Sequence, residues 1–124
     1  EVLILDEPTA GLDPKGRDEI LDEISALHRE HHMTIVLVSH SMEDIARYAD
    51  RIMVMNHGEK IFDAPPKEVF RHYKELEAIG LAAPQITYIV QGLKEHGVPI
   101  ADDITTVTEA RDAILHLLGK DERP

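Results

Sequence analysis

Cysteine is absent from this chain of 124 residues, so neither a disulfide framework nor a cysteine-ligated zinc site can form. Long hydrophobic runs are absent as well. Purely aliphatic stretches such as Ile35–Val38 are far shorter than the ~20 residues needed to span a bilayer. No signal peptide is visible. These absences favour an intracellular protein whose role at a membrane, if it has one, depends on a protein partner.

Basic residues are scarce. Thirteen Lys and Arg against 24 Asp and Glu give a formal net charge of −11 with histidine neutral. Such an acidic surface repels phosphate backbones and anionic lipid headgroups, which argues against nucleic acid or bare membrane as a direct partner. An initiator Met is also missing, and Glu1–Leu5 reads as a strand already under way. We therefore expect the chain to be a fragment of a longer protein.

Two short apolar segments, Val2–Leu5 and Thr34–Val38, have the continuous hydrophobic character of strands buried on both faces of a parallel sheet. Between them, Asp13 is placed to cap a helix that has Pro14 in its first turn and runs to about His31. The predicted buried face of this helix consists of Ile20, Ile24 and Leu27. The alternation of strand and helix predicts an α/β fold.

The middle of the chain predicts a β-hairpin followed by a short helix. Residues 56–58, Asn-His-Gly, are typical of a tight turn between strands at 51–55 and 59–62. The Pro-Pro pair at 65–66 then begins a helix that carries two apolar residues, Val69 and Phe70.

From about Gly80 the sequence predicts two amphipathic helices. Pro84 leads into the first, and Thr106 with Glu109 forms a capping box for the second. The apolar stripes are Ile86, Ile89, Val90 and Leu93 on the first helix, and Val107, Ala110, Ile114, Leu117 and Leu118 on the second. We expect a small helical appendage on a sheet-containing core.

Polar pairs follow the two predicted strands: Asp6-Glu7 after the first and Ser39-His40 after the second. The carboxyl edge of an open parallel sheet is where ligands bind. Adjacent carboxylates disfavour each other unless a cation is near. Bound Mg²⁺ would resolve this for one of them, directly or through water, and the other would deprotonate an attacking water. Taken alone, the acidic pair fits a solvated loop equally well, and His40 fits a hydrogen-bonded histidine at a strand end.

Two further patterns have simpler explanations. The glycine spacing of residues 11–16 mimics a phosphate-binding P-loop, but Arg17 and Asp18 stand where Lys and Ser or Thr are required. The histidines near the end of the first helix are His28, His31 and His32. Because no further ligand accompanies them, a solvated helix terminus explains them better than a metal site.

Two long motifs resemble those of ABC ATPases. Residues 3–14, LILDEPTAGLDP, closely resemble the family's Walker B segment and D-loop, and residues 35–70, IVLVSHSMEDIARYADRIMVMNHGEKIFDAPPKEVF, resemble its switch-histidine region and the hairpin beyond. The resemblance covers residues 1 to about 72. It implies a partial P-loop NTPase fold of the RecA-like kind, with residues 1–80 as the C-terminal part of the nucleotide-binding domain and residues 81–124 as a small helical C-terminal extension.

The resemblance also implies roles for four residues, with ATP and Mg²⁺ as the ligands. Asp6 would hold Mg²⁺ through water, and Glu7 would act as the general base on the hydrolytic water. His40 would contact the γ-phosphate and help hold the water and Glu7 in line. Asp13 would be the D-loop aspartate, a nucleotide-site residue that faces the other nucleotide-binding subunit across the dimer.

Three motifs of the resembled family are missing: the P-loop, the LSGGQ signature and the glutamine loop. In an intact subunit they would precede Glu1. The P-loop supplies most of the phosphate cradle through backbone N–H groups. We therefore expect these 124 residues alone to have no appreciable ATP binding or hydrolysis.

The tail narrows the resemblance. Residues 80–115, GLAAPQITYIVQGLKEHGVPIADDITTVTEARDAIL, resemble the C-terminal extension of energy-coupling-factor transporter ATPases, which import vitamins or cobalt and nickel ions. The implied function is ATP-driven energy coupling, peripheral to the cytoplasmic face of the cell membrane. The implied partners are a second ATPase subunit, identical or not, a transmembrane coupling protein and a substrate-binding membrane subunit.

Three alternatives remain open. The tail is also compatible with the ATPase of another prokaryotic ABC importer. A non-transport ABC ATPase, bound to ribosomes or DNA, would usually carry a second ABC domain, coiled coils or basic surfaces, none of which the acidic tail shows. In the third alternative, the 124 residues by themselves act only as an interaction module.

Overall fold

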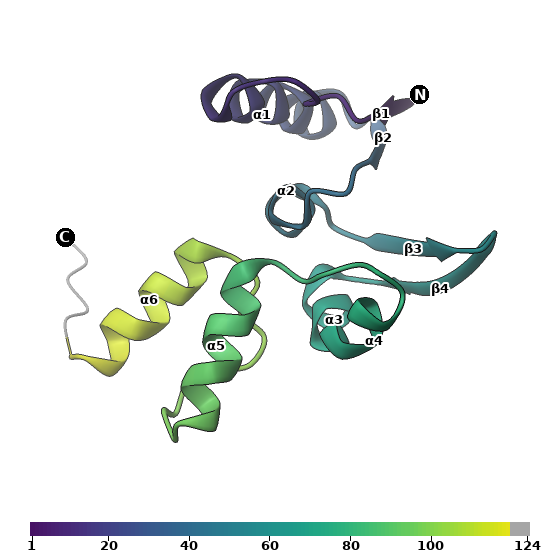
Figure 1. Ribbon diagram of the computed structural model, residues 1–124. Coiled ribbons are helices and arrows are strands. Elements are labelled where there is room, and N and C mark those ends of the chain that lie inside the picture. The colour runs from purple at the N-terminus through teal and green to yellow at the C-terminus, as the bar shows by residue number, and fades with distance from the viewer. Residues whose placement is uncertain (120–124) are drawn as a thin grey trace. The chain divides into compact units, whose positions relative to one another are not determined.

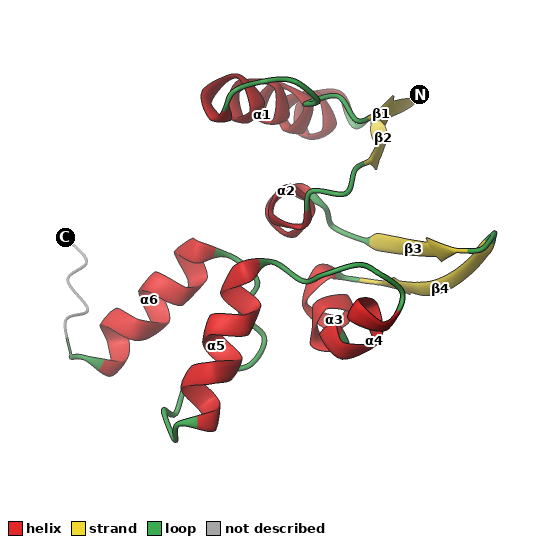
Figure 2. Cartoon of the chain, viewed as in Figure 1, coloured by secondary structure: helices red, strands yellow, loops and turns green. Residues whose placement is uncertain are grey.

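The structure is a computed structural model, which describes residues 1–119. Contacts within the chain divide it into two compact units, Glu1–Ser41 and Met42–Pro124, each described by itself. Strands and helices alternate in the first unit, whereas the second consists of a hairpin and several helices (Figures 1 and 2). The boundary predicted near residue 80 falls inside the second unit and stays a prediction.

The first unit consists of β1 (Val2–Asp6), α1 (Pro14–His31) and β2 (Thr34–Val38). The strands pair in parallel, in a register that runs from Val2 opposite Thr34 to Asp6 opposite Val38. Two consecutive parallel strands need a crossover connection, and α1 supplies it. The predicted strand–helix–strand order is therefore confirmed.

The cap of α1 forms as predicted. The Asp13 carboxylate accepts a hydrogen bond from the Gly16 backbone N–H at 2.8 Å, and Pro14 occupies the first helical position. At the other end, His32 adopts a left-handed conformation (φ 51°) that stops the helix. The imidazole Nδ1 of His28 lies 2.7 Å from the Met33 carbonyl oxygen, so this histidine belongs to the helix terminus.

The expectation that both strands are buried on two faces is wrong for this sheet. Leu21 of α1 is almost fully buried, because α1 covers one face. Alternate strand residues point to the other face, which no element of this unit covers. The exposed residues there are Val2, Ile4, Val36 and Val38, with Val2 and Ile4 exposed by 64% and 68%.

The second unit begins with α2 (Met42–Tyr48) and continues into a hairpin formed by β3 (Ile52–Asn56) and β4 (Glu59–Ala64). Two residues connect the strands, His57 (φ 49°) and Gly58 (φ 78°). Both have positive φ, as the primed hairpin turns require, which explains the glycine. The predicted hairpin is thus confirmed, with Asn56 paired to Glu59 as the last residue of β3.

Two short helices cover one face of the hairpin, α3 (Pro66–Arg71) and α4 (Tyr73–Ala78). The helix from Pro66 was predicted from the sequence, but α4 was not. The core between these elements consists of Ile52, Val54, Val69, Phe70, Leu76 and Ala83.

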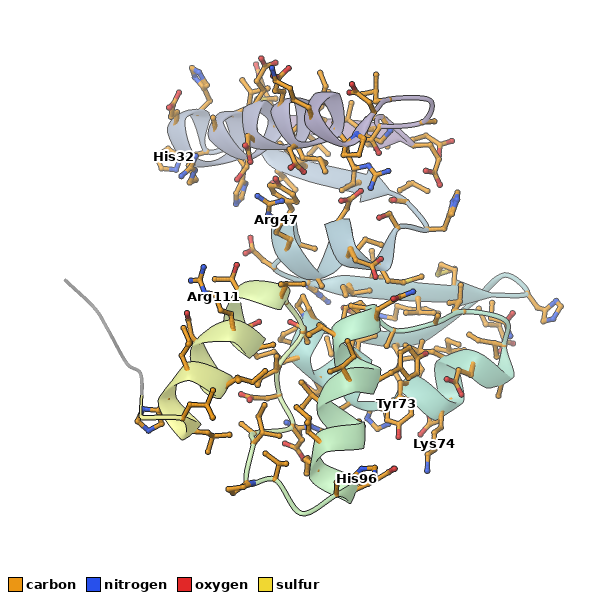
Figure 3. All side chains as sticks on the ribbon, turned by 60° about the vertical axis from the view of Figure 1, so that its left-hand side comes forward. His32, Arg47, Tyr73, Lys74, His96 and Arg111 are labelled. Carbon is orange, nitrogen blue, oxygen red and sulfur yellow. The ribbon has the colours of Figure 1, made fainter. Side chains whose placement is uncertain are left out.

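The last two helices are α5 (Gln85–Glu95) and α6 (Val107–Leu117), which pack against each other. The buried residues between them and in the connecting loop are Val90, Ile100, Ile104 and Ala110. Tyr73, labelled in Figure 3, meets the ring of Tyr88 edge-on with 5.6 Å between centroids, which joins α4 to α5. The predicted helix pair is confirmed.

The stripe predicted on α6 is mostly not buried within the chain. Ala110 is buried, but the other four apolar residues of the stripe are exposed: Val107 by 71%, Ile114 by 36%, Leu117 by 40% and Leu118 by 62%. On α5, Ile89 is likewise exposed by 55%. The two helices meet through small side chains of α6, so its larger apolar residues lie outside their contact. We call Val107, Ile114, Leu117 and Leu118 the α6 apolar face.

Candidate active site

The structure brings the two predicted polar pairs to one edge of the first sheet. Asp6 ends β1 opposite Val38, and Glu7 follows it. The Glu7 backbone N–H donates to the Val38 carbonyl at 2.8 Å, which continues the ladder one step beyond the strand. Because the strands are parallel, their carboxyl ends coincide, and His40 leaves β2 beside Glu7.

Glu7 and His40 are in direct contact. The Glu7 carboxylate Oε1 and the His40 Nδ1 are 2.6 Å apart. The Glu7 side chain is 35% exposed and that of His40 84% exposed, so the pair is accessible from solvent. An accessible carboxylate hydrogen-bonded to an imidazole is an arrangement that can support general-base chemistry.

The backbone of Glu7 is unusual. Its φ of 48° lies in the left-handed region, which non-glycine residues seldom adopt. Conformations of this kind cost on the order of 1–3 kcal/mol and are concentrated at functional sites. Here the turn reverses the chain just after β1: the Ala10 N–H donates to the Glu7 carbonyl at 3.2 Å. The sequence pattern gave no sign of this conformation.

A second turn shapes the loop that carries His40. The Ser41 backbone N–H donates to Ser39 Oγ at 3.0 Å, a local side-chain bond that folds the loop around His40. Ser39 was noticed in the sequence only as the neighbour of His40, and this contact was not predicted. A serine two residues before the donating N–H was the available signal.

Asp13 lies on the loop between β1 and α1, which also carries Glu7, and its carboxylate accepts the bond of the helix cap described above. That cap also explains the second glycine of the P-loop look-alike. A Cβ on Gly16 would lie 2.9 Å from the Asp13 Oδ1, closer than real Cβ atoms approach. The first, Gly11, has φ 78° and serves the turn. The spacing therefore follows from the turn and the cap, in agreement with the sequence argument.

Asp6, the last residue of β1, is exposed to solvent. Within residues 1–119, no three His, Cys, Asp or Glu side chains are grouped so as to hold a metal ion. A single exposed carboxylate such as that of Asp6 fits Mg²⁺, because Mg²⁺ keeps several waters and needs only one or two carboxylates together with substrate phosphates.

The chain is similar in sequence to known ATP-binding proteins. No family model matches the chain. It is 57% identical over 119 residues to the energy-coupling factor transporter ATP-binding protein EcfA2 of Clostridium tetani, covering 96% of this chain and 41% of that protein. The protein of the same name from Clostridium perfringens is 53% identical over 118 residues, covering 95% and 41%.

A solved structure agrees in fold. The structure described as cbiO1 from Clostridium perfringens, part of the ABC transporter complex cbiONQ, is 38% identical with a TM-score of 0.54. The match covers 73% of this chain and 36% of that one. The predicted resemblance to energy-coupling-factor ABC ATPases and the α/β, partial P-loop NTPase fold class are thereby confirmed. The chain spans about two fifths of the length of the curated relatives it matches.

Proposed function

We propose that the chain is part of the ATP-hydrolysing subunit of an energy-coupling-factor importer for vitamins or metal ions. Residues 1–80 would be the C-terminal part of the nucleotide-binding domain, and residues 81–124 a helical extension. The observation that carries the proposal is the 2.6 Å contact between Glu7 and His40 at the carboxyl edge of a parallel sheet. The likeness to ATP-binding subunits over nearly the whole chain supports it.

In the proposed reaction, Glu7 takes a proton from the water that attacks the γ-phosphate of ATP, and ADP leaves as the bond between the β- and γ-phosphates breaks. His40 holds the Glu7 carboxylate through Nδ1, which leaves Nε2 for the phosphate. Mg²⁺, when bound, would neutralise charge that develops on the phosphate oxygens. Asp6 would hold the water shell of this ion, and Asp13 would face the second ATPase subunit from the start of α1.

The proposed partners follow from the same reading. They are a second ATPase subunit, a transmembrane coupling protein and a substrate-binding membrane subunit, with the chain peripheral to the cytoplasmic face of the membrane. No helix within the described residues is long and apolar enough to cross a membrane. Neither nucleic acid nor direct lipid insertion belongs to the proposal, in keeping with the net charge of −11.

Replacing His40 by alanine tests the site. In the complete subunit, His40→Ala should lower steady-state ATP hydrolysis by roughly tenfold to a hundredfold, because a hydrogen bond to a charged group contributes about 1.5–3 kcal/mol. Nucleotide affinity should fall much less. His28→Ala is the matched control, since its imidazole bonds a backbone carbonyl at the end of α1. Unchanged turnover in His40→Ala would remove this residue from the site.

The α6 apolar face supports a role in assembly. Apolar surface left in water costs about 25 cal/mol per Å², and a second subunit covering this face would recover that free energy. Replacing both Leu117 and Leu118 by serine should weaken the nucleotide-free dimer of the complete subunit several-fold, measured by sedimentation. Arg111→Ser, on the same helix, should leave the dimer unchanged. If the parent, the double variant and Arg111→Ser have equal dimer stability, this face contacts no second subunit.

A further inference from the structure

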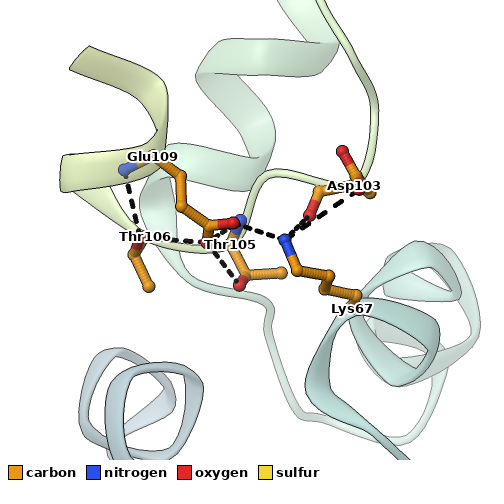
Figure 4. Close-up of polar contacts among 5 residues, drawn as sticks. All are labelled: Lys67, Asp103, Thr105, Thr106 and Glu109. Atoms are coloured by element: carbon orange, nitrogen blue, oxygen red, sulfur yellow. Dashed lines mark hydrogen bonds and ion pairs between the residues drawn. The ribbon is translucent and has the colours of Figure 1, made fainter. Parts of the chain in front are cut away.

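A cluster of polar contacts joins α3 to the loop and helix that follow α5 (Figure 4). The Lys67 ammonium group, on α3, donates a hydrogen bond to the Asp103 carbonyl oxygen at 3.0 Å and another to the Glu109 Oε2. The Asp103 carboxylate Oδ2 lies 4.0 Å from the same nitrogen. An ammonium group has three N–H donors, which matches the three oxygens around the Lys67 nitrogen. We call these contacts the Lys67 clasp.

The other oxygen of Glu109 completes the start of α6. Glu109 Oε1 accepts from the Thr106 hydroxyl at 3.0 Å and lies within 3.4 Å of the Thr105 backbone N–H. In return, Thr106 Oγ accepts from the Glu109 backbone N–H at 3.2 Å. One carboxylate therefore serves both the helix cap and the lysine. Partial burial opposes ionisation of Glu109, but the hydrogen bonds from Lys67 and Thr106 outweigh it and lower the pKa.

Among the described residues, the Lys67 clasp links the start of α6 to α3, and the pair of Lys94 and Asp102 links the preceding loop to α5. The segment from residue 98 to 106 has no helix or strand, and α6 meets α5 through Ala110 and Ala113. By contrast, α5 is attached at its own N-terminus: the Gln85 backbone N–H donates to Glu43 of α2 at 3.1 Å. Lys67 of α3 thus bonds both the loop before α6 and the first turn of α6.

We propose that Lys67 is a positioning residue, which holds α6 in a fixed orientation on α3 so that the α6 apolar face is presented to a partner subunit. The presentation to a partner rests on the proposed function, whereas the fixed orientation does not. Lys67 lies within residues 1–80 and its partners within residues 81–124. The clasp therefore connects the part that resembles the nucleotide-binding domain to the extension and makes the two move together.

An isolated surface ion pair contributes little, with typical values near 0–1 kcal/mol. The side chains of Lys67 and Glu109 are 47% and 35% exposed, so solvent partly weakens their ion pair. The clasp differs because its carboxylate is shared with a helix cap and its lysine also bonds a backbone carbonyl. Thr105 and Ile104, beside it, are both buried, which limits the freedom of the loop.

Hydrogen exchange in the complete subunit tests the fixed orientation without reference to assembly. Lys67→Met removes the charge and keeps the length, so amides in the first turns of α6 should exchange about tenfold faster. Lys94→Met is the matched control: Lys94 pairs with Asp102 at 3.0 Å, and both residues lie within residues 81–124. It should leave α6 unchanged, and Lys67→Arg should retain most of the protection. Equal α6 exchange in Lys67→Met and the parent would overturn the proposal.

Sedimentation of the same variants tests the presentation of the α6 apolar face. Lys67→Met should weaken the nucleotide-free dimer several-fold although the face itself is intact, and Lys94→Met should not. If the double Leu117, Leu118→Ser variant weakens the dimer while Lys67→Met does not, the presentation is wrong and the subunit contact stands. If the double variant does not weaken the dimer, the α6 apolar face does not contact a second subunit. The hydrogen-exchange result alone then decides whether Lys67 fixes the orientation of α6.

Discussion

In the complete subunit, Glu7→Gln should reduce steady-state ATP hydrolysis by roughly two to four orders of magnitude, the contribution typical of a general base. Glutamine has nearly the same shape as glutamate, and its amide can still bond to the His40 Nδ1, now 2.6 Å from the Glu7 Oε1. It cannot accept a proton from the attacking water. Turnover should therefore be lost while nucleotide affinity and closure of the subunit pair remain.

The measurement needs both a rate and a binding constant. Steady-state hydrolysis reports turnover, and equilibrium titration with ATP reports affinity for the same protein. Glu19→Gln is a suitable control, because Glu19 is an exposed residue of α1 whose partner is Lys15 at 3.9 Å. Turnover of Glu7→Gln within a few-fold of the parent would exclude Glu7 as the base. A parallel loss of affinity would instead indicate that the turn after β1 had changed.

The sequence predicted most of the elements because their signals are local. Asp13 and Pro14 mark the start of α1, and the Thr106 and Glu109 pair marks the start of α6. In both cases the cap side chain accepts from a backbone N–H three residues further on. The hairpin turn is equally local, since its geometry requires positive φ at two adjacent positions. The polar pairs after β1 and β2 could be placed together because parallel strands end at the same edge.

What the sequence did not predict depends on distant residues or on missing neighbours. Lys67 and Glu109 are 42 positions apart, and no pattern connects two charged residues at that spacing. Continuous apolar strands predict burial on two faces, but burial also needs elements to cover them, and α1 covers only one. The left-handed Glu7 escaped prediction because its side chain gives no preference for that conformation; the turn that imposes it is a property of the folded loop.

The chain has two phenylalanines, which allows a matched test of the core of the second unit. Phe70 on α3 is 2% exposed and packs among Val69, Leu76 and the hairpin residues. Phe62 on β4 is only half-buried and stacks on the His72 ring at 5.3 Å. Phe70→Ala should lower the free energy of unfolding by about 3–5 kcal/mol, from lost burial and the cavity left behind.

That loss is large compared with the total of about 5–15 kcal/mol for a typical domain, so Phe70→Ala should unfold at a clearly lower urea concentration than the parent. Phe62→Ala removes the same atoms from a site that water already reaches, and it should cost substantially less. Urea denaturation followed by far-ultraviolet circular dichroism measures both variants of the chain. If Phe62→Ala and Phe70→Ala were equally destabilising, the packing of α3 on the hairpin would not be the main support of this unit, and the assignment of its core would have to change.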